Sequence, residues 1–185
     1  SGGYSPTLGM SACREALVKY EEYMYGIEGM NAHQIAIGAS STQLTTDIMK
    51  VLLDPHDKIL LLDPSYCNFP TQITSTIEVE IIRFPVVDPN TWKYVADERI
   101  EEFSKFIMTE KPKVILLVSP DNPTSQIPSN KFVTAALNAA KEVGAFLVID
   151  FAYKDIVFSE ALPEYYSWKP NDNFLSIHSN SKWSR

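Results

Sequence analysis

Glycine is scarce in this chain. Its 185 residues include seven glycines, and six of them lie within the first 38 positions. The seventh, Gly144, stands alone. A glycine-rich phosphate loop of the Walker type or of the dinucleotide-binding type needs several closely spaced glycines. The sequence therefore excludes both loops, and any phosphate that the protein binds must be held by other groups.

Cysteine, positive charge and long apolar runs are scarce as well. The two cysteines, Cys13 and Cys67, give no disulfide framework and no metal-ligand spacing, so we expect reduced thiols and no metal site. Lys and Arg number 16 against 23 Asp and Glu, and the net charge of -7 argues against binding to nucleic acid or anionic membranes. No apolar run reaches the roughly 18 residues that span a bilayer. Residues 1–4 lack the basic and apolar regions of a signal peptide, so we expect a cytoplasmic protein.

The residues that are present suit a globular domain with a core, since 45% are hydrophobic and 21% are charged. A length of 185 residues favours one domain, at 1–185. Short apolar runs predict six strands, at 33–38, 58–63, 79–84, 113–119, 145–150 and 173–178. The remaining stretches predict five helices, at 11–25, 42–53, 68–76, 97–109 and 129–143. Ser11 is the expected cap of the first helix, and Gly26 is its expected end.

Two of the expected strands indicate the kind of sheet. Residues 114–118 and 146–149 are continuously apolar, as in strands that are buried on both faces. Strands that alternate with helices form right-handed crossovers and a mostly parallel sheet. The sequence therefore predicts an α/β fold with three layers, in which helices cover both faces of a doubly wound, mostly parallel sheet.

The residues that follow the strands are the candidate site residues, because ligands of doubly wound sheets bind beyond the carboxyl ends of the strands. These residues offer hydroxyls, an amide, an ammonium group and aromatic rings, and they lie at 39–42, 64–66, 120–123, 151–153 and 179–182. One strand also ends in an acid, Asp150. The sequence thus predicts one polar edge of the sheet.

Each candidate has an ordinary explanation beside a functional one. Lys182 is either a surface charge or a reactive amine, since burial can lower the pKa of a lysine and make it nucleophilic. Asp150 is a helix cap, a salt-bridge partner or the counter-ion of a ligand cation, because an unpaired buried carboxylate is costly. Ser40, Ser41 and Thr42 either cap a helix or bind an anion at its first turn.

The remaining candidates are equally ambiguous when taken singly. Asn122 could be a turn residue. Tyr66 and Tyr153 could be ordinary half-buried rings.

Four short sequence strings that follow predicted strands are more informative together than singly. They read Asp-Pro-Ser-Tyr at 63–66, Ser-Pro-Asp-Asn-Pro-Thr at 119–124, Asp-Phe-Ala-Tyr at 150–153 and Ser-Asn-Ser-Lys at 179–182. This ordered set resembles the class I and II aminotransferases, fold-type I enzymes that use pyridoxal 5'-phosphate (PLP). Tyr-Ser-Pro-Thr-Leu-Gly at 4–9, followed by Cys-Arg-Glu-Ala-Leu at 13–17, also looks like the opening segment of that family. The resemblance spans essentially the whole chain.

The resemblance implies a role for each candidate at the cofactor ring. Lys182 would form a Schiff base with PLP and move the proton at the substrate Cα. Asp150 would pair with the pyridine nitrogen and keep it protonated, which makes the ring a better electron sink. Asn122 and Tyr153 would hydrogen-bond the phenolic oxygen, and Tyr66 would stack on the ring. Lys182, Asp150 and Tyr153 are the expected catalytic residues.

The resemblance also implies a phosphate site. Ser179 would bind the phosphate together with Ser40, Ser41 and Thr42. An alternative register of the chain would use 38–40 instead, but the preferred register keeps the usual length of the following helix. Tyr4 would reach the phosphate of a partner subunit, which implies a homodimer with shared active sites.

Two departures from the family pattern affect what we expect. Ser125 stands where the family usually has glycine after Asn-Pro-Thr. The chain ends at Arg185, and the phosphate-binding arginine of the family lies farther beyond the lysine than that. We therefore expect a partial large domain, without the late antiparallel strand and the small domain that carries the substrate-carboxylate arginine.

The expected reaction is transfer of an amino group from an amino acid to a 2-oxo acid, and we expect these small molecules as partners. Other fold-type I chemistry stays open, namely a C–S lyase, a decarboxylase or an aminocyclopropane-forming lyase. A non-catalytic module that keeps the fold as a ligand sensor is a further alternative. The isolated chain is expected to retain PLP weakly and to have no useful turnover.

Overall fold

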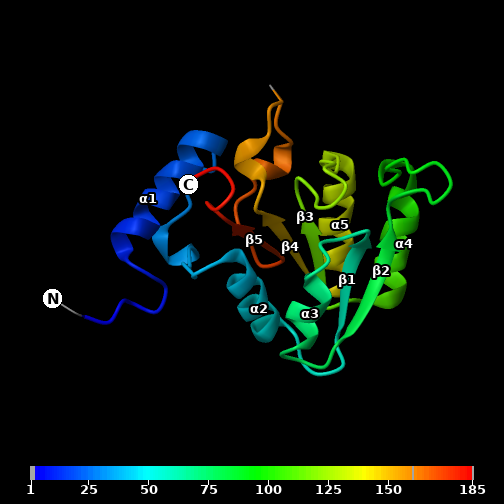
Figure 1. The fold of residues 1–185 in the computed structure, drawn as a ribbon, viewed down its shortest axis with the longest axis horizontal. Coiled ribbons are helices and arrows are strands. Elements are labelled where there is room, and N and C mark those ends of the chain that lie inside the picture. Colours follow the sequence, from blue (N-terminus) through cyan, green and yellow to red (C-terminus); the bar gives the residue numbers. More distant parts are fainter. Residues whose placement is uncertain (1–2, 160, 185) are drawn as a thin grey trace.

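The computed structural model describes residues 3–159 and 161–184 and contains a five-stranded parallel sheet between layers of helices (Figure 1). The strands are β1 (Lys58–Asp63), β2 (Glu80–Pro85), β3 (Val114–Val118), β4 (Phe146–Phe151) and β5 (Phe174–His178). Their spatial order is β2-β1-β3-β4-β5, and every neighbouring pair is parallel. The predicted α/β fold class is thereby confirmed.

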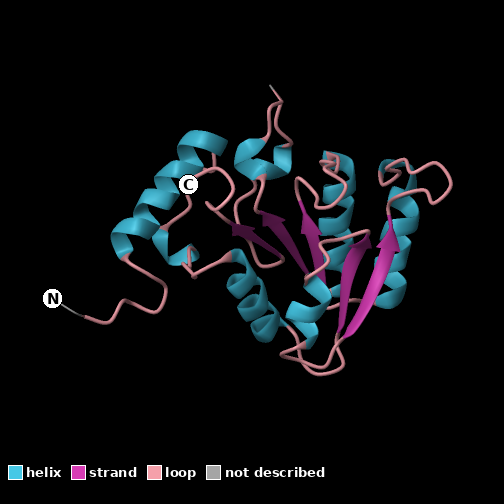
Figure 2. Ribbon diagram, in the orientation of Figure 1, coloured by secondary structure: helices cyan, strands magenta, loops and turns pink. Residues whose placement is uncertain are grey.

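The five predicted helices are present (Figure 2). They are α1 (Ser11–Tyr25), α2 (Ser41–Leu52), α3 (Phe69–Thr74), α4 (Ile100–Glu110) and α5 (Asn130–Val143). Short 3-10 turns add η1 (Ala32–Gln34), η2 (Asp97–Arg99), η3 (Lys154–Ile156) and η4 (Glu164–Ser167). The connection from β4 to β5 passes through η3 and η4 instead of an α-helix. None of the helices in the described ranges has the length and apolar character needed to cross a membrane.

Helix α1 begins and ends largely where its sequence predicts. Gly26 ends it in the left-handed conformation, with a φ of 66° that favours glycine. Ser11 is the first helical residue and not the cap, which is Met10. The Ser11 hydroxyl instead donates to the Glu15 carboxylate at 3.0 Å, one turn along the helix.

The predicted strand at 33–38 is wrong. This segment begins in η1 and then continues as an extended loop outside the sheet, where the Ile37 amide donates to the carbonyl of Leu8 at 3.0 Å. Its apolar character has another cause, because residues 34–39 line a cavity. None of residues 33–38 is buried, so this short apolar run marks a cavity wall and not a strand of the core.

Two apolar cores lie on opposite faces of the sheet. Leu60 of β1 belongs to the core beneath α4 and α5, where the rings of Phe103 and Phe132 stack with centroids 4.5 Å apart. Its neighbour Ile59 belongs to the other core, which packs against α2 and α3. Each such buried side chain contributes about 1.5–3 kcal/mol. The continuously apolar strands follow from this arrangement, since both of their faces are covered.

The order of the strands locates the place where a ligand is expected. The chain crosses from β1 to β2 on one side and then returns to β3 on the other side of β1. The winding therefore reverses between β1 and β3. In open α/β sheets, ligands bind outside the carboxyl ends of the strands at such a reversal.

Candidate active site

A cavity of about 740 Å³ lies at the carboxyl edge of the sheet. Nine of the ten predicted site residues line it, and they come from the loops after β1, β3, β4 and β5 and from the first turn of α2. They are Ser40, Ser41, Thr42, Tyr66, Asn122, Asp150, Tyr153, Ser179 and Lys182. A cavity of this size suits a small-molecule ligand. The structure thus brings together residues that lie up to 142 positions apart in the chain.

Tyr4 is the tenth predicted site residue, and it does not line this cavity. Its side chain is fully exposed. Its predicted contact is with a partner subunit, so this role stays a prediction. Arg185, the residue at which the chain ends, lies outside the described residues.

Asp150 is the buried acid of the site. It lies in β4 between Val118 of β3 and Ile177 of β5, and its side chain is 7% exposed. One oxygen, Oδ1, accepts a hydrogen bond from the Ala152 amide at 2.9 Å. Within residues 3–159 and 161–184, no group donates to the other oxygen and no cation pairs with the carboxylate. The salt-bridge explanation for Asp150 therefore finds no partner in the described chain.

Burial sets the electrostatics of this acid. Removal from water raises the pKa of Asp150 from 3.8 to about 6, and the hydrogen bond from Ala152 opposes the rise. A carboxylate in this position lowers its free energy when a cation approaches its free oxygen. The site is therefore prepared for a positively charged ligand group.

Asn122, Tyr153 and Lys182 lie together beside Asp150 in the cavity wall. The Asn122 amide donates to the Tyr153 hydroxyl at 3.2 Å. The Lys182 ammonium lies 5.5 Å from the centroid of the Tyr153 ring. The Lys182 side chain is exposed. A primary amine, an amide and a phenol thus face one space.

The first turn of α2 offers free backbone amides at the cavity without a glycine-rich loop. Ser40 is the N-cap, and its hydroxyl accepts from the Gln43 amide at 3.1 Å. The amides of Ser41 and Thr42 have no acceptor within the described part of the chain. Free N–H groups at the positive end of a helix favour a phosphate. The alternative register at 38–40 lines the same cavity, so Ser40 borders it in either register.

Two further predicted residues complete the wall. Tyr66 is half-buried, and its ring meets Phe69 edge-on with centroids 5.3 Å apart. The Ser179 and Ser181 hydroxyls lie 2.8 Å apart in the turn before Lys182. The cavity therefore has a hydroxyl-rich part and an aromatic part.

Three cavity residues or neighbours of the cavity are absent from the sequence-based set. Glu21 of α1 and His178 of β5 line the cavity, and Lys154 is buried directly after Tyr153. The sequence offered one signal for Lys154, because Lys154 and Asp155 directly follow the string at 150–153. Glu21 carried no such signal, because it is one of three acids on α1 and nothing in the sequence distinguishes it from the other two.

Comparison with known protein families decides among the possible families. The family described as aminotransferase class I and II matches residues 1–183. The chain belongs to this family. Its members are PLP-dependent and have the fold-type I architecture. The resemblance inferred from the four strand-end strings is confirmed.

Individual aminotransferases are similar at a moderate level. The aspartate aminotransferase of Pyrococcus horikoshii is 23% identical over 85% of this chain, and the transaminase BacF of Bacillus subtilis is 28% identical over 85%. The chain spans 39% and 38% of the lengths of these two relatives. The solved alanine aminotransferase from Pyrococcus furiosus shares the fold with a TM-score of 0.81 and 24% identity, covering 97% of this chain and 44% of its own.

Proposed function

We propose that residues 1–185 are the PLP-binding large domain of an aminotransferase, which transfers an amino group from an amino acid to a 2-oxo acid. The observation that carries the proposal is Asp150, a buried carboxylate that faces the cavity with a free oxygen and no cationic partner in the described chain. PLP presents a cationic ring nitrogen that suits this oxygen. When bound, PLP supplies an electron sink for the carbanion at the substrate Cα.

The residues of the cavity fit the other parts of the cofactor. Asp150 accepts the hydrogen bond of the ring nitrogen and holds the proton on that atom. Asn122 and Tyr153, already joined at 3.2 Å, direct their polar hydrogens to the phenolic oxygen. Tyr66 covers one face of the ring from the loop after β1. Each group acts on a different atom, so together they fix the orientation of the ring.

The phosphate is bound at the start of α2. The free amides of Ser41 and Thr42 donate to it, and the hydroxyls of Ser40 and Ser179 border the same cavity. The partial positive charge of the α2 N-terminus adds attraction for the anion. This arrangement replaces the glycine-rich loop that the sequence lacks. We further propose that Tyr4 of a partner subunit contributes to this site, and that the protein is a homodimer.

Lys182 supplies the amine of the site. Its amine would hold the cofactor and would take and return the proton at the substrate Cα. The exposed position of Lys182 at the cavity mouth gives its amine the freedom to make both contacts. Tyr153 lies beside it and orients the amine through its ring and hydroxyl.

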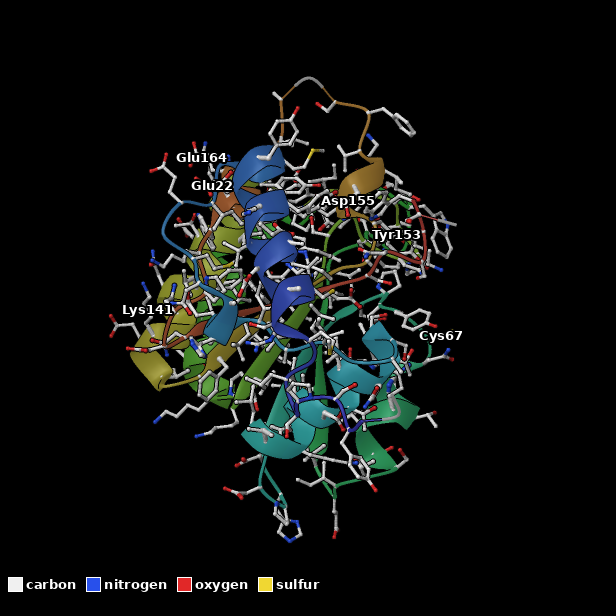
Figure 3. The ribbon with its side chains drawn as sticks, turned by 90° about the vertical axis from the view of Figure 1, so that its left-hand side faces the viewer. Glu22, Cys67, Lys141, Tyr153, Asp155 and Glu164 are labelled. Atoms are coloured by element: carbon white, nitrogen blue, oxygen red, sulfur yellow. The ribbon has the colours of Figure 1, made fainter. Side chains whose placement is uncertain are left out.

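The test is covalent labelling of the full-length protein. PLP is added, borohydride reduction fixes any lysine-bound cofactor, and peptide mass spectrometry locates it. We expect the label on Lys182 and its loss in Lys182→Ala. The control is Lys141→Ala, an exposed lysine of α5 that Figure 3 shows far from Tyr153. Labelling of Lys182→Ala at the wild-type level would refute the assignment.

The reaction itself needs a second measurement. The relatives named above are aminotransferases, which favours transamination over elimination or decarboxylation. The full-length protein is incubated with single amino acids and 2-oxoglutarate. Formation of glutamate supports the proposal, whereas release of ammonia, sulfide or carbon dioxide without glutamate would assign another PLP-dependent reaction.

A further inference from the structure

A second group of charged side chains lies directly beside the cavity and takes no part in the proposed cofactor contacts. Lys154, the residue after Tyr153, is 2% exposed, and its ammonium lies 3.0 Å from Oε2 of Glu21 on α1. The other carboxylate oxygen, Oε1, lies 3.3 Å from Nδ1 of His178, the residue before Ser179. One carboxylate therefore contacts the segment after β4 and the last residue of β5.

The burial of these charges makes the arrangement specific. Glu21 is 8% exposed, and Lys154 lies over the Tyr25 ring at 3.5 Å from its centroid. Burial lowers the pKa of Lys154 and raises that of Glu21, and their mutual attraction opposes both shifts. Breaking such a pair leaves an uncompensated buried charge. Glu21 is therefore held against Lys154.

His178 completes the contact as a neutral ring. Burial lowers its pKa far below the ordinary value, and the nearby Lys154 ammonium adds to this effect. A neutral imidazole has one N–H. In the tautomer that carries it on Nδ1, this atom lies 3.3 Å from Oε1 of Glu21. Nε2 then accepts from the Ser176 hydroxyl at 3.0 Å.

Helix α1 is itself fixed against the segments after β4 and β5. The Tyr20 hydroxyl donates to Asp155 at 2.7 Å, and the Tyr25 hydroxyl donates to the same oxygen. The Tyr20 ring stacks on Trp183, directly after Lys182, with centroids 5.8 Å apart. Figure 3 shows Asp155 on the other side of the α1 ribbon from Glu22. Glu21 therefore lies on a helix that contacts both segments. A displacement of α1 with one segment would disturb its contacts with the other.

We propose that Glu21 is a positioning residue whose two carboxylate oxygens hold the loop that carries Tyr153 and the turn that carries Ser179 and Lys182 in one fixed arrangement. The inference rests on the proposed function, because those three residues are its proposed cofactor ligands. A ligand set held by a rigid supporting shell binds more tightly than the same set on loose loops.

The test compares Glu21→Gln with Glu22→Gln in the full-length protein. The amide of the first variant keeps the size of the side chain but offers one acceptor oxygen instead of two. Glu22 is the next residue of α1 and is exposed, so its variant is a matched control. We measure the Kd for PLP by absorbance titration and the imidazole signals of His178 by 15N spectroscopy.

We expect Glu21→Gln to raise the Kd for PLP by about tenfold or more, because small displacements of positioned groups are costly. We also expect the His178 signals to shift while those of the exposed His33 and His56 stay unchanged. Glu22→Gln should alter neither. A wild-type Kd together with unshifted His178 signals in Glu21→Gln would overturn the inference.

A second variant guards against loss of folding. Glu21→Gln with Lys154→Met removes both buried charges, an exchange that buried pairs often tolerate. The folded double variant should still bind PLP more weakly than wild type, and a wild-type Kd would overturn the inference. If the wild-type protein itself binds no PLP, the proposed function fails. The His178 signals then still decide whether Glu21 contacts the turn, since an absence of shift in Glu21→Gln refutes that contact.

Discussion

The two ends of the sheet carry charged residues in opposite ways. At the carboxyl end, Asp150 is buried, faces the cavity and has no cationic partner in the described chain. At the amino end, Lys58 begins β1 and pairs with Glu110 of α4 at 2.7 Å, with each side chain about one-third exposed (33% and 31%). Asp150 is thus left without a cationic partner at the end where a ligand is proposed, whereas Lys58 is paired at the other end. From this difference we propose that the carboxyl end is a binding end and that the amino end is a solubility end.

The direction of the helices adds to this contrast. Helix α2 leads into the start of β1, and its own start lies at the cavity with the free amides of Ser41 and Thr42. Helix α5 ends instead at Gly144, in the left-handed conformation with a φ of 70°, just before β4 begins. Helix N-termini attract anions and helix C-termini do not. The start of α2 therefore favours an anion at the carboxyl end of the sheet, and the end of α5 does not favour one at the amino end.

The largest effect that would test this contrast is that of Asp150→Asn in the full-length protein. We expect transamination to fall by about 10²–10³-fold, because the amide cannot stabilise a cationic ring nitrogen as a carboxylate does. The measurement is kcat/KM with a saturating amino acceptor. Glu110→Gln, the same kind of change at the amino end, should leave kcat/KM unchanged. Equal kcat/KM values for Asp150→Asn and wild type would refute a role of the Asp150 carboxylate in the reaction.

The sequence predicted most of the helices and strands and most of the candidate residues that line the cavity, and it did so for physical reasons. Continuously apolar runs such as 114–118 are specific to strands covered on both faces, and the residue after each strand is placed at the carboxyl edge by topology alone. The segment 33–38 failed, because lining a cavity and joining a sheet demand the same apolar composition. The fold thus follows from local patterns, whereas some of the cavity wall does not.

The buried contact between Glu21 and Lys154 could not be predicted from the sequence, for a different reason. Glu21 and Lys154 are 133 positions apart, and their contact exists only once α1 packs beside the loop after β4. No periodicity or motif joins two single charges over such a distance. Lys182 is a second example. The sequence predicted that it lies at the cavity, but it did not predict that its side chain is exposed.

A smaller effect of Asp150→Asn concerns the free energy of unfolding. At neutral pH the variant is expected to be more stable than wild type, although it is expected to be less active. In the cofactor-free protein, the pKa of Asp150 is about 6 when folded, against an ordinary value of 3.8. Because the folded value is the higher one, the contribution of Asp150 is fully present below about pH 4 and is lost as the pH rises through about 6. The loss is up to about 3 kcal/mol at pH 7 to 8.

Urea unfolding of the cofactor-free full-length protein and of Asp150→Asn measures this loss. The variant should gain stability relative to wild type as the pH is raised from 4 to 7, since the asparagine has no charge to bury. Subtracting the two curves removes the titration of all other groups. A difference that is independent of pH would mean that the carboxylate is not held in a desolvated state. Stabilisation by bound PLP should be larger for wild type than for the variant.

The smallest effect is expected for Lys58→Met at the amino end. The Lys58–Glu110 pair is close, but both side chains are partly solvated, and exposed ion pairs add little to stability because water and salt screen them. Thermal unfolding in low and high salt should therefore differ little between the variant and wild type, and the Kd for PLP should be the same. A change in PLP affinity would mean that the two ends of the sheet are coupled through β1. The division between a binding end and a solubility end would then be wrong, because a charge remote from the cavity would be acting on it.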